Sequence, residues 1–285
     1  MRVEFCGVRG SAPAPGPEFV RYGGNTSCLA IGDGDGSDPT LLLDAGSGLS
    51  RLGPLLGGRP FRGTVLLGHL HWDHTHGLPF APALDRDDAV VRLLLPAQGG
   101  GSAEELLAQA MSPPSFPITP GQLRGRWSFG CLEAGRHEIE GFAVLAREIP
   151  HKGGRTFGYR VDDGRAGIAY LSDHSPTSLG PGPDGLGARH DAALELADGV
   201  DVLVHDAQYT AAEFADRRDW GHSAIDYAVG LAAEAGARSL VLFHHDPRRT
   251  DDELDALAGS LEHAPVPVSV AREGDGLTLP RRPTP

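Results

Sequence analysis

Six consecutive residues, His69-Leu70-His71-Trp72-Asp73-His74, constrain this chain more than any other feature of its sequence. They begin just beyond an apolar run at residues 64–67, which predicts a buried strand. Side chains alternate between the two faces of an extended backbone, so His69 and His71 would lie on the same side. Asp73 and His74 would then fall on the turn beyond the strand. Imidazole and carboxylate groups are ligands for zinc and similar metals, and the cluster therefore predicts a metal site at a strand end.

The order of the other elements indicates central sheets with helices outside. Apolar runs predict strands at residues 2–6, 28–31, 40–44, 64–67, 90–95, 142–149, 156–161, 168–171, 200–204, 239–243 and 276–279. Helical spacing predicts helices at residues 103–111, 192–197, 223–235 and 251–262. Strands come first and then mix with helices, a pattern typical of one domain, here residues 1–285, in which helices cover sheets.

Composition narrows the class of partner. The 285 residues carry a net charge of −13 and no run of Lys or Arg, which disfavours extended RNA or DNA and leaves a small anionic substrate. No apolar stretch is long enough for a membrane span, and residues 1–5 resemble a strand rather than a secretory signal. We therefore expect a cytoplasmic protein without a membrane partner. Three widely spaced cysteines argue against a disulfide framework and a thiolate zinc site.

The cluster resembles the HxHxDH motif of the metallo-β-lactamase superfamily, and the resemblance spans nearly the whole chain. It implies an α/β (α+β) fold, the four-layer αββα sandwich with two central mixed sheets flanked by helices. It also implies two divalent metal ions, with zinc expected and manganese or iron as alternatives. One ion would be held by His69, His71 and His151, and the other by Asp73, His74 and His244, with Asp173 shared between them.

Three further positions follow from the same resemblance. Asp44, which closes an apolar strand, resembles the family's structural acid before a glycine turn. His244 is favoured over its neighbour His245 as the strand-end ligand, but the choice stays open. His174 stands where the family pattern has threonine, and is interpreted as a surface residue or a substrate contact.

Three shorter motifs resemble the branch that contains tRNA 3′-processing endonucleases (ribonuclease Z) and related phosphodiesterases. Residues 204–209 (Val-His-Asp-Ala-Gln-Tyr) are similar to its HEAT-type motif, and Gly221-His222-Ser223 to its GHS motif. Gly10-Ser11, together with residues 25–27, resembles its opening loop.

The branch implies a catalytic assignment. Asp73 would orient a hydroxide that bridges the two metals. His222 would hydrogen-bond the phosphate or protonate the leaving oxygen, and Asp206 or His205 would orient His222.

The branch's endonucleases usually carry a long arm that grips tRNA, and no basic insertion of that kind exists here. Residues 96–135 form an apolar, Pro-rich insertion that we interpret as a lid or a dimer contact, which would fit a homodimer. The sequence thus favours a phosphodiesterase acting on a small phosphodiester such as a cyclic nucleotide. The alternatives are a ribonuclease Z-like RNA 3′-end endonuclease, a lactone or thioester hydrolase, and a binding or regulatory protein without turnover.

Overall fold

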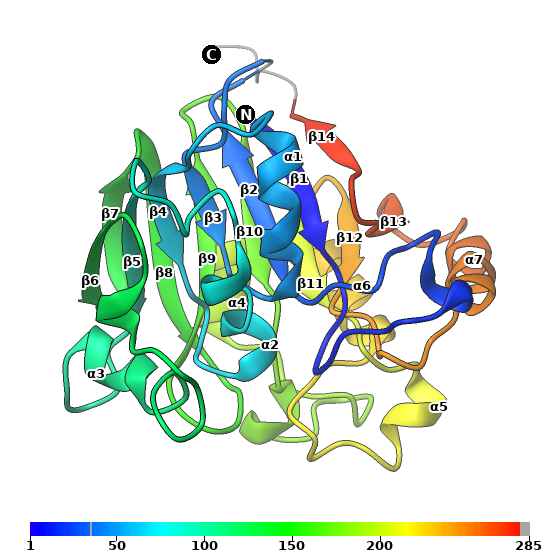
Figure 1. The fold of residues 1–285 in the computed structure, drawn as a ribbon. Coiled ribbons are helices and arrows are strands. Elements are labelled where there is room, and N and C mark those ends of the chain that lie inside the picture. Colours follow the sequence, from blue (N-terminus) through cyan, green and yellow to red (C-terminus); the bar gives the residue numbers. More distant parts are fainter. Residues whose placement is uncertain (35, 280–285) are drawn as a thin grey trace.

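The computed structural model describes residues 1–34 and 36–279, which fold into two seven-stranded sheets (Figure 1). The first sheet has the spatial order β14 (Gly276–Thr278), β1 (Arg2–Gly7), β2 (Cys28–Gly32), β3 (Leu41–Leu43), β4 (Arg62–Leu66), β5 (Val90–Pro96) and β6 (Arg126–Leu132). The second has the order β13 (Val268–Val270), β12 (Leu240–Phe243), β11 (Val202–Asp206), β10 (Gly167–Leu171), β9 (Thr156–Asp162), β8 (Phe142–Ile149) and β7 (Gly135–Ile139). Both sheets contain parallel and antiparallel pairs, so both are mixed as expected.

Helices cover the outer face of each sheet. The helices on the first-sheet side are α1 (Leu52–Leu55), α2 (Trp72–Thr75) and α3 (Ala103–Ala108). The second sheet is covered by α4 (Asp191–Ala197), α6 (Ile225–Glu234) and α7 (Asp251–Ser260), while α5 (Ala211–Phe214) follows β11. Short 3₁₀ helices lie at η1 (Pro17–Phe19), η2 (Ser47–Arg51), η3 (Leu78–Phe80), η4 (Pro120–Gln122) and η5 (Pro176–Leu179). The predicted four-layer αββα sandwich is confirmed.

The two sheets lie in the middle of the sandwich because their strands are apolar on both faces. In β3, Leu41 and Leu43 belong to the core between the two sheets, whereas Leu42 belongs to the core beneath the outer helices. A strand covered on both sides needs apolar side chains at every position, which is why this segment is an unbroken apolar run. The inner core joins residues of both sheets, and on that basis we propose that residues 1–285 form one domain.

Most element boundaries lie within two or three residues of the predictions, and four differences are informative. The helix predicted to reach residue 111 ends at Ala108, before the Pro-rich segment. The strand predicted from residue 200 begins at Val202. The turn expected at Asp73 and His74 is the short helix α2. The sequence set no bounds for β6 and β7, and it missed β13, whose three residues follow Pro265 and Pro267 and give too short a signal.

None of the helices in residues 1–34 and 36–279 is long and apolar enough to cross a membrane. The cytoplasmic location expected from the sequence stays a prediction.

Asp44 is a buried carboxylate that ties the two sheets together at one end. Its backbone is left-handed, with φ of 61°, a conformation that Asp and Asn tolerate better than other non-glycine residues. Its oxygens accept hydrogen bonds from the Gly68 amide at 2.7 Å and the Tyr170 hydroxyl at 2.8 Å. The Ser172 hydroxyl donates a further bond at 3.2 Å, and Nδ1 of His74 lies 2.7 Å away. Asp44 therefore links the end of β3 to the histidine motif and to β10.

We predict that Asp44→Ala lowers the free energy of unfolding of the metal-free protein by about 3 kcal/mol, because it leaves buried donors without an acceptor. Asp44→Asn keeps an acceptor oxygen and the left-handed preference, so its loss should be smaller. Urea denaturation followed by circular dichroism measures both. An Asp44→Ala protein as stable as the parent would contradict the structural role of this carboxylate.

Candidate metal centre

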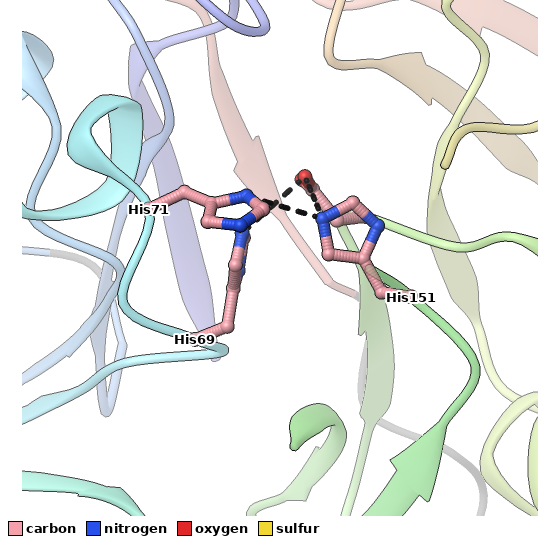
Figure 2. A group of neighbouring side chains, drawn as sticks. His69, His71 and His151 are labelled. Atoms are coloured by element: carbon pink, nitrogen blue, oxygen red, sulfur yellow. Dashed lines mark hydrogen bonds and ion pairs between the residues drawn. The ribbon is translucent and has the colours of Figure 1, made fainter. Parts of the chain in front are cut away.

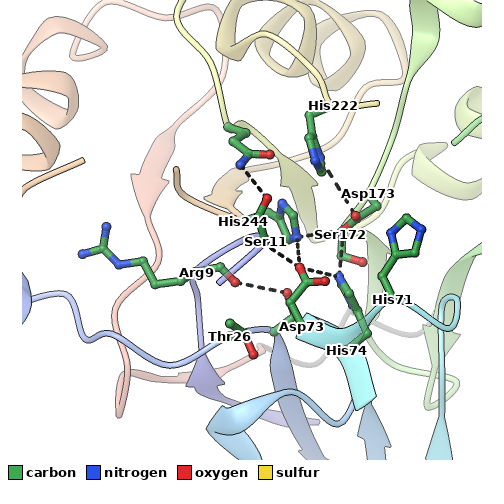
Figure 3. Close-up of polar contacts among 12 residues, drawn as sticks. Arg9, Ser11, Thr26, His71, Asp73, His74, Ser172, Asp173, His222 and His244 are labelled. Carbon is green, nitrogen blue, oxygen red and sulfur yellow. Dashed lines mark hydrogen bonds and ion pairs between the residues drawn. The ribbon is translucent and has the colours of Figure 1, made fainter. Parts of the chain in front are cut away.

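The candidate metal centre lies where strands of both sheets end. His69, His71, Asp73 and His74 follow β4, His151 follows β8, Asp173 follows β10 and His244 follows β12. Figure 3 shows His74 and His244, from two of these segments, directed at Asp73 and Asp173. His244 has a left-handed backbone with φ of 60°, so it turns sharply at the end of β12. All seven residues predicted as metal ligands are therefore brought together.

The first group consists of three imidazoles and one carboxylate oxygen. Nε2 of His69 lies 3.5 Å from Oδ2 of Asp173, and Nε2 of His151 lies 3.3 Å from the same oxygen. Nδ1 of His71 is 3.2 Å from Nε2 of His151. Figure 2 draws this contact as a dashed line between the two rings. The Gly221 carbonyl lies 2.7 Å from Nδ1 of His151, which fixes the ring and leaves Nε2 facing the group.

The second group faces the other oxygen of Asp173. Nε2 of His244 lies 2.9 Å from Oδ1 of Asp173, and Nε2 of His74 lies 3.1 Å from it. Both nitrogens also approach Oδ2 of Asp73, at 3.1 Å and 3.2 Å respectively. His245 turns away, with Nε2 3.0 Å from the Ala271 carbonyl oxygen. The geometry thus favours His244 over His245, as the sequence did.

Several buried nitrogen and oxygen atoms of the two ligand groups lack hydrogen-bond partners, as expected of atoms that bind a cation. Among the described residues, His69 Nε2, His74 Nε2 and Asp173 Oδ1 are buried and make no well-formed hydrogen bond. A buried polar atom without a partner is costly, and a cation between the groups would satisfy these atoms. Three imidazoles with a carboxylate, and two imidazoles with two carboxylates, are donor sets that zinc and similar divalent metals accept. The residues present fit two such ions that share Asp173.

The electrostatics of the two groups differ. Burial and the neighbouring His74 lower the pKa of His69, and burial likewise lowers the pKa of His71 and His151. Burial is the largest single influence on His244 and opposes its protonation. The charge and hydrogen bond of Asp173, the hydrogen bond of Asp73 and the charge of Asp206 together outweigh burial and raise the pKa of His244 to about 10. The first group therefore offers neutral nitrogens, whereas at the second group cations compete with protons.

The loop after β1 contacts Asp73 and His244 of the second ligand group. The sequence pointed to this loop only through the resemblance of Gly10-Ser11 to the opening loop of the branch. A Cβ atom on Gly10 would lie 2.2 Å from Nδ1 of His244, so only glycine allows this close approach. The Ser11 amide donates a hydrogen bond of 2.7 Å to Oδ2 of Asp73. Sequence reasoning missed this contact because it comes from the backbone.

His222 lies beside the metal centre and is oriented by Asp206. Nδ1 of His222 is 3.1 Å from Oδ2 of Asp206, which also accepts hydrogen bonds from the Ser223 and His174 amides. Asp206, His222 and His244 together could also hold a cation. Because two backbone amides already bind the Asp206 oxygen nearest His222, we favour a role for Asp206 in holding the ring.

His205 does not contact His222. Its Nδ1 lies 2.6 Å from the Asp206 carbonyl oxygen and its Nε2 lies 2.9 Å from Nδ1 of His174. Burial lowers the pKa of His205 to about 4. Of the two residues predicted to orient His222, the geometry therefore favours Asp206.

His174 occupies neither of the places predicted for it. The side chain is fully buried, so it is not a surface residue, and it does not line the pocket at the metal centre. It packs against the rings of His190, His205 and Tyr227 instead. The interpretation was wrong because β10 and β11 pair in parallel, which sets their ends side by side beneath α6.

An open pocket of about 410 Å³ lies over the metal centre. His71, Asp73, His151, Asp173 and His222 line it, together with Ser11, Leu70, Trp72, Lys152 and Trp220. Lys152 is the only lysine in the chain, and it is exposed. Its position directly after His151 in the sequence was the one signal of its place at this pocket.

We predict that Asp173→Ala loses both cations, since this carboxylate faces both groups, whereas His71→Ala and His244→Ala each lose one. Removing a residue that only hydrogen-bonds to a metal ligand typically weakens metal binding by about 10- to 100-fold. Removing a ligand itself should weaken metal binding more than that. His76→Ala is the matched control, because His76 is exposed and lies just beyond the motif. Equilibrium dialysis against zinc, followed by elemental analysis, measures the stoichiometry. Full zinc content in Asp173→Ala would contradict the shared-ligand assignment.

The chain is similar to known proteins both in sequence and in fold. A ribonuclease Z of Bradyrhizobium sp. (strain ORS 278) is 29% identical over 289 residues, covering 84% of this chain and 90% of that protein. The solved structure of the metallo-beta-lactamase fold protein YhfI from Bacillus subtilis is 20% identical, covers 97% of this chain and 98% of that chain, and gives a TM-score of 0.68. A new diphosphatase from the PhnP family is 18% identical, with 98% of each chain covered and a TM-score of 0.68.

The family comparison covers most of the chain. The model of the beta-lactamase superfamily domain matches residues 40–245, which include the histidine motif and all seven predicted ligands. The predicted resemblance to this superfamily and to its ribonuclease Z branch is confirmed. The chain therefore belongs to the beta-lactamase superfamily.

Proposed function

We propose that this protein is a dinuclear metal-dependent phosphodiesterase that acts on a small phosphodiester. The observation that carries the proposal is the Asp173 carboxylate, whose two oxygens face separate ligand groups in an open pocket. The ribonuclease Z relative and the diphosphatase neighbour support a metal-dependent hydrolase of phosphoric esters. Zinc is the proposed metal, with manganese or iron as alternatives.

The ions would be held by His69, His71, His151 and Asp173 on one side, and by Asp73, His74, His244 and Asp173 on the other. Bound there, two divalent ions would supply Lewis acidity, which polarises a phosphoryl oxygen and makes a nearby water more acidic. Asp73, which receives the Ser11 amide and faces His244, would orient that water at the pocket floor.

His222 is the proposed proton donor to the leaving oxygen. Its Nδ1 contacts Asp206, so Nε2 is the nitrogen left for a substrate in the pocket that His222 lines. The buried Asp206 carboxylate fixes the ring, so that Nε2 would pass its proton to the leaving oxygen as the ester bond breaks. In this assignment Asp206 is a positioning residue, and His205 acts further away by holding the Asp206 backbone.

Charge at the pocket rim supports an anionic substrate. Lys152 lines the pocket, and the described residues include no ion-pair partner for it within 4 Å, so its ammonium group is available to a phosphate. The rest of the chain does not suit long nucleic acid, given the net charge of −13. Cleavage of RNA 3′ ends, the activity suggested by the ribonuclease Z name, remains the second candidate because that relative covers most of this chain.

We predict that the purified protein, loaded with zinc or manganese, hydrolyses bis(p-nitrophenyl) phosphate, and that a chelator abolishes the activity. Release of p-nitrophenol measured at 405 nm checks this. A protein that holds two metals yet leaves this diester intact, while hydrolysing a lactone or thioester, would contradict the phosphodiesterase proposal.

We predict that His222→Ala keeps both cations but loses about 100-fold or more of kcat, because general acid catalysis typically contributes that much. Asp206→Asn should show a smaller loss, since the ring remains but is held less firmly. His263→Ala is the control, because this histidine is exposed and far along the chain. Full turnover by a metal-loaded His222→Ala protein would remove His222 from the mechanism.

A further inference from the structure

A second pocket opens beside the metal centre and has different chemistry. It encloses about 550 Å³, which falls within the range of sites that bind small organic ligands. One wall comes from the metal motif and the segment after it, through Leu70, Trp72 and Phe80. The other comes from α3 and the loop that follows it, through Leu106, Met111 and Phe116. Figure 1 shows α2 and α3 at the same end of the molecule.

The two pockets share a wall. Leu70 and Trp72 line both this apolar pocket and the pocket over the metal centre. Leu70 stands between the predicted ligands His69 and His71 in the sequence, so a residue that lines both pockets is flanked by two residues of the metal centre. A substrate with its phosphate at the metals can therefore extend an attached group into the second pocket.

The residues that line the apolar pocket indicate which chemical group of the substrate it can bind. No Asp, Glu, Lys or Arg is among the described residues that line the apolar pocket. Aromatic rings form its rim: Phe80 is 68% exposed and meets Phe116 edge to face, with centroids 5.8 Å apart. Trp72, 66% exposed, stacks on His76 at 5.5 Å. Thr75, Gln109 and Ser115 add a few polar atoms to a lining that is otherwise mostly apolar. The rings favour an aromatic or alkyl group, because a charged group would lose hydration without gaining a charged partner.

We propose that this pocket binds the apolar ester group of the substrate, so that the enzyme prefers phosphodiesters with one aromatic or long alkyl arm. The proposal rests on the proposed phosphodiesterase function and assigns a role to residues 96–135, the segment predicted as a lid or dimer contact. The part of that segment between β5 and β6 supplies the pocket wall, while the rest contributes the edge strand β6.

Two esters with the same leaving group test the proposal. Phenyl p-nitrophenyl phosphate places a ring in the pocket, and methyl p-nitrophenyl phosphate does not. We expect the wild-type protein to favour the phenyl ester in kcat/KM by about tenfold or more, a size typical of apolar pocket discrimination. Ala110→Trp, at an exposed position on the wall, should fill the pocket and bring the ratio at least several-fold closer to one. Differences in intrinsic reactivity cancel, because both esters are compared in both proteins.

Phe80→Ala is a second variant that removes an exposed rim residue and so spares the core, and it should reduce the same ratio. Leu179→Ala is the control, since Leu179 is a similarly exposed apolar residue outside both pockets. Binding of phenylphosphonate and methylphosphonate to the metal-loaded protein, measured by calorimetry, gives a readout without turnover. Wild type should bind the phenyl compound more tightly, and Ala110→Trp should remove the difference.

The possible failures are distinct. Hydrolysis of neither ester by protein that holds its metals would overturn the phosphodiesterase function. If the protein hydrolyses both esters but Ala110→Trp and Phe80→Ala leave the phenyl-to-methyl ratio of kcat/KM unchanged, only the apolar subsite is overturned. A change from dimer to monomer in these variants, with unchanged ratios, would identify the pocket as an interface between two copies and would equally overturn the subsite.

Discussion

The Asp173 carboxylate is the contact on which the rest of the site depends. One oxygen faces His69 and His151, and the other faces His74 and His244. Four imidazoles around one fully buried carboxylate would be a costly arrangement of polar groups in a metal-free core. Two cations that share this carboxylate would turn that cost into binding energy, since the donor atoms are already directed at the space between them.

The fold explains how residues distant in sequence meet at this carboxylate. Strands β10, β11 and β12 pair in parallel, so Asp173, Asp206 and His244 leave the second sheet at the same edge. The first sheet delivers the histidine motif beyond β4, and Asp44 holds that motif against Tyr170 of β10. The same edge carries the apolar pocket, whose second wall comes from the segment between β5 and β6. Metal centre and apolar pocket are thus two parts of one surface.

Much of the fold could be predicted because its strands are apolar on both faces and end at recognisable polar residues. The candidate ligand set followed from the resemblance to the metallo-β-lactamase motifs, and His151, Asp173 and His244 each stand within two residues of the end of a strand. Three features were beyond the reach of the sequence. The burial of His174 depends on the parallel pairing of β10 with β11. The left-handed backbones of Asp44 and His244 occur at non-glycine residues, which rarely adopt that conformation. The apolar pocket joins segments about 30 residues apart whose contact no periodicity encodes.

Anomalous diffraction at the zinc absorption edge, from crystals of the zinc-loaded protein, would show whether seven side chains hold two ions across one carboxylate. This arrangement predicts two anomalous peaks per chain, one on the side of His69, His71 and His151 and one on the side of Asp73, His74 and His244, with Asp173 between them. A single peak, or peaks that Asp173 does not contact, would contradict it.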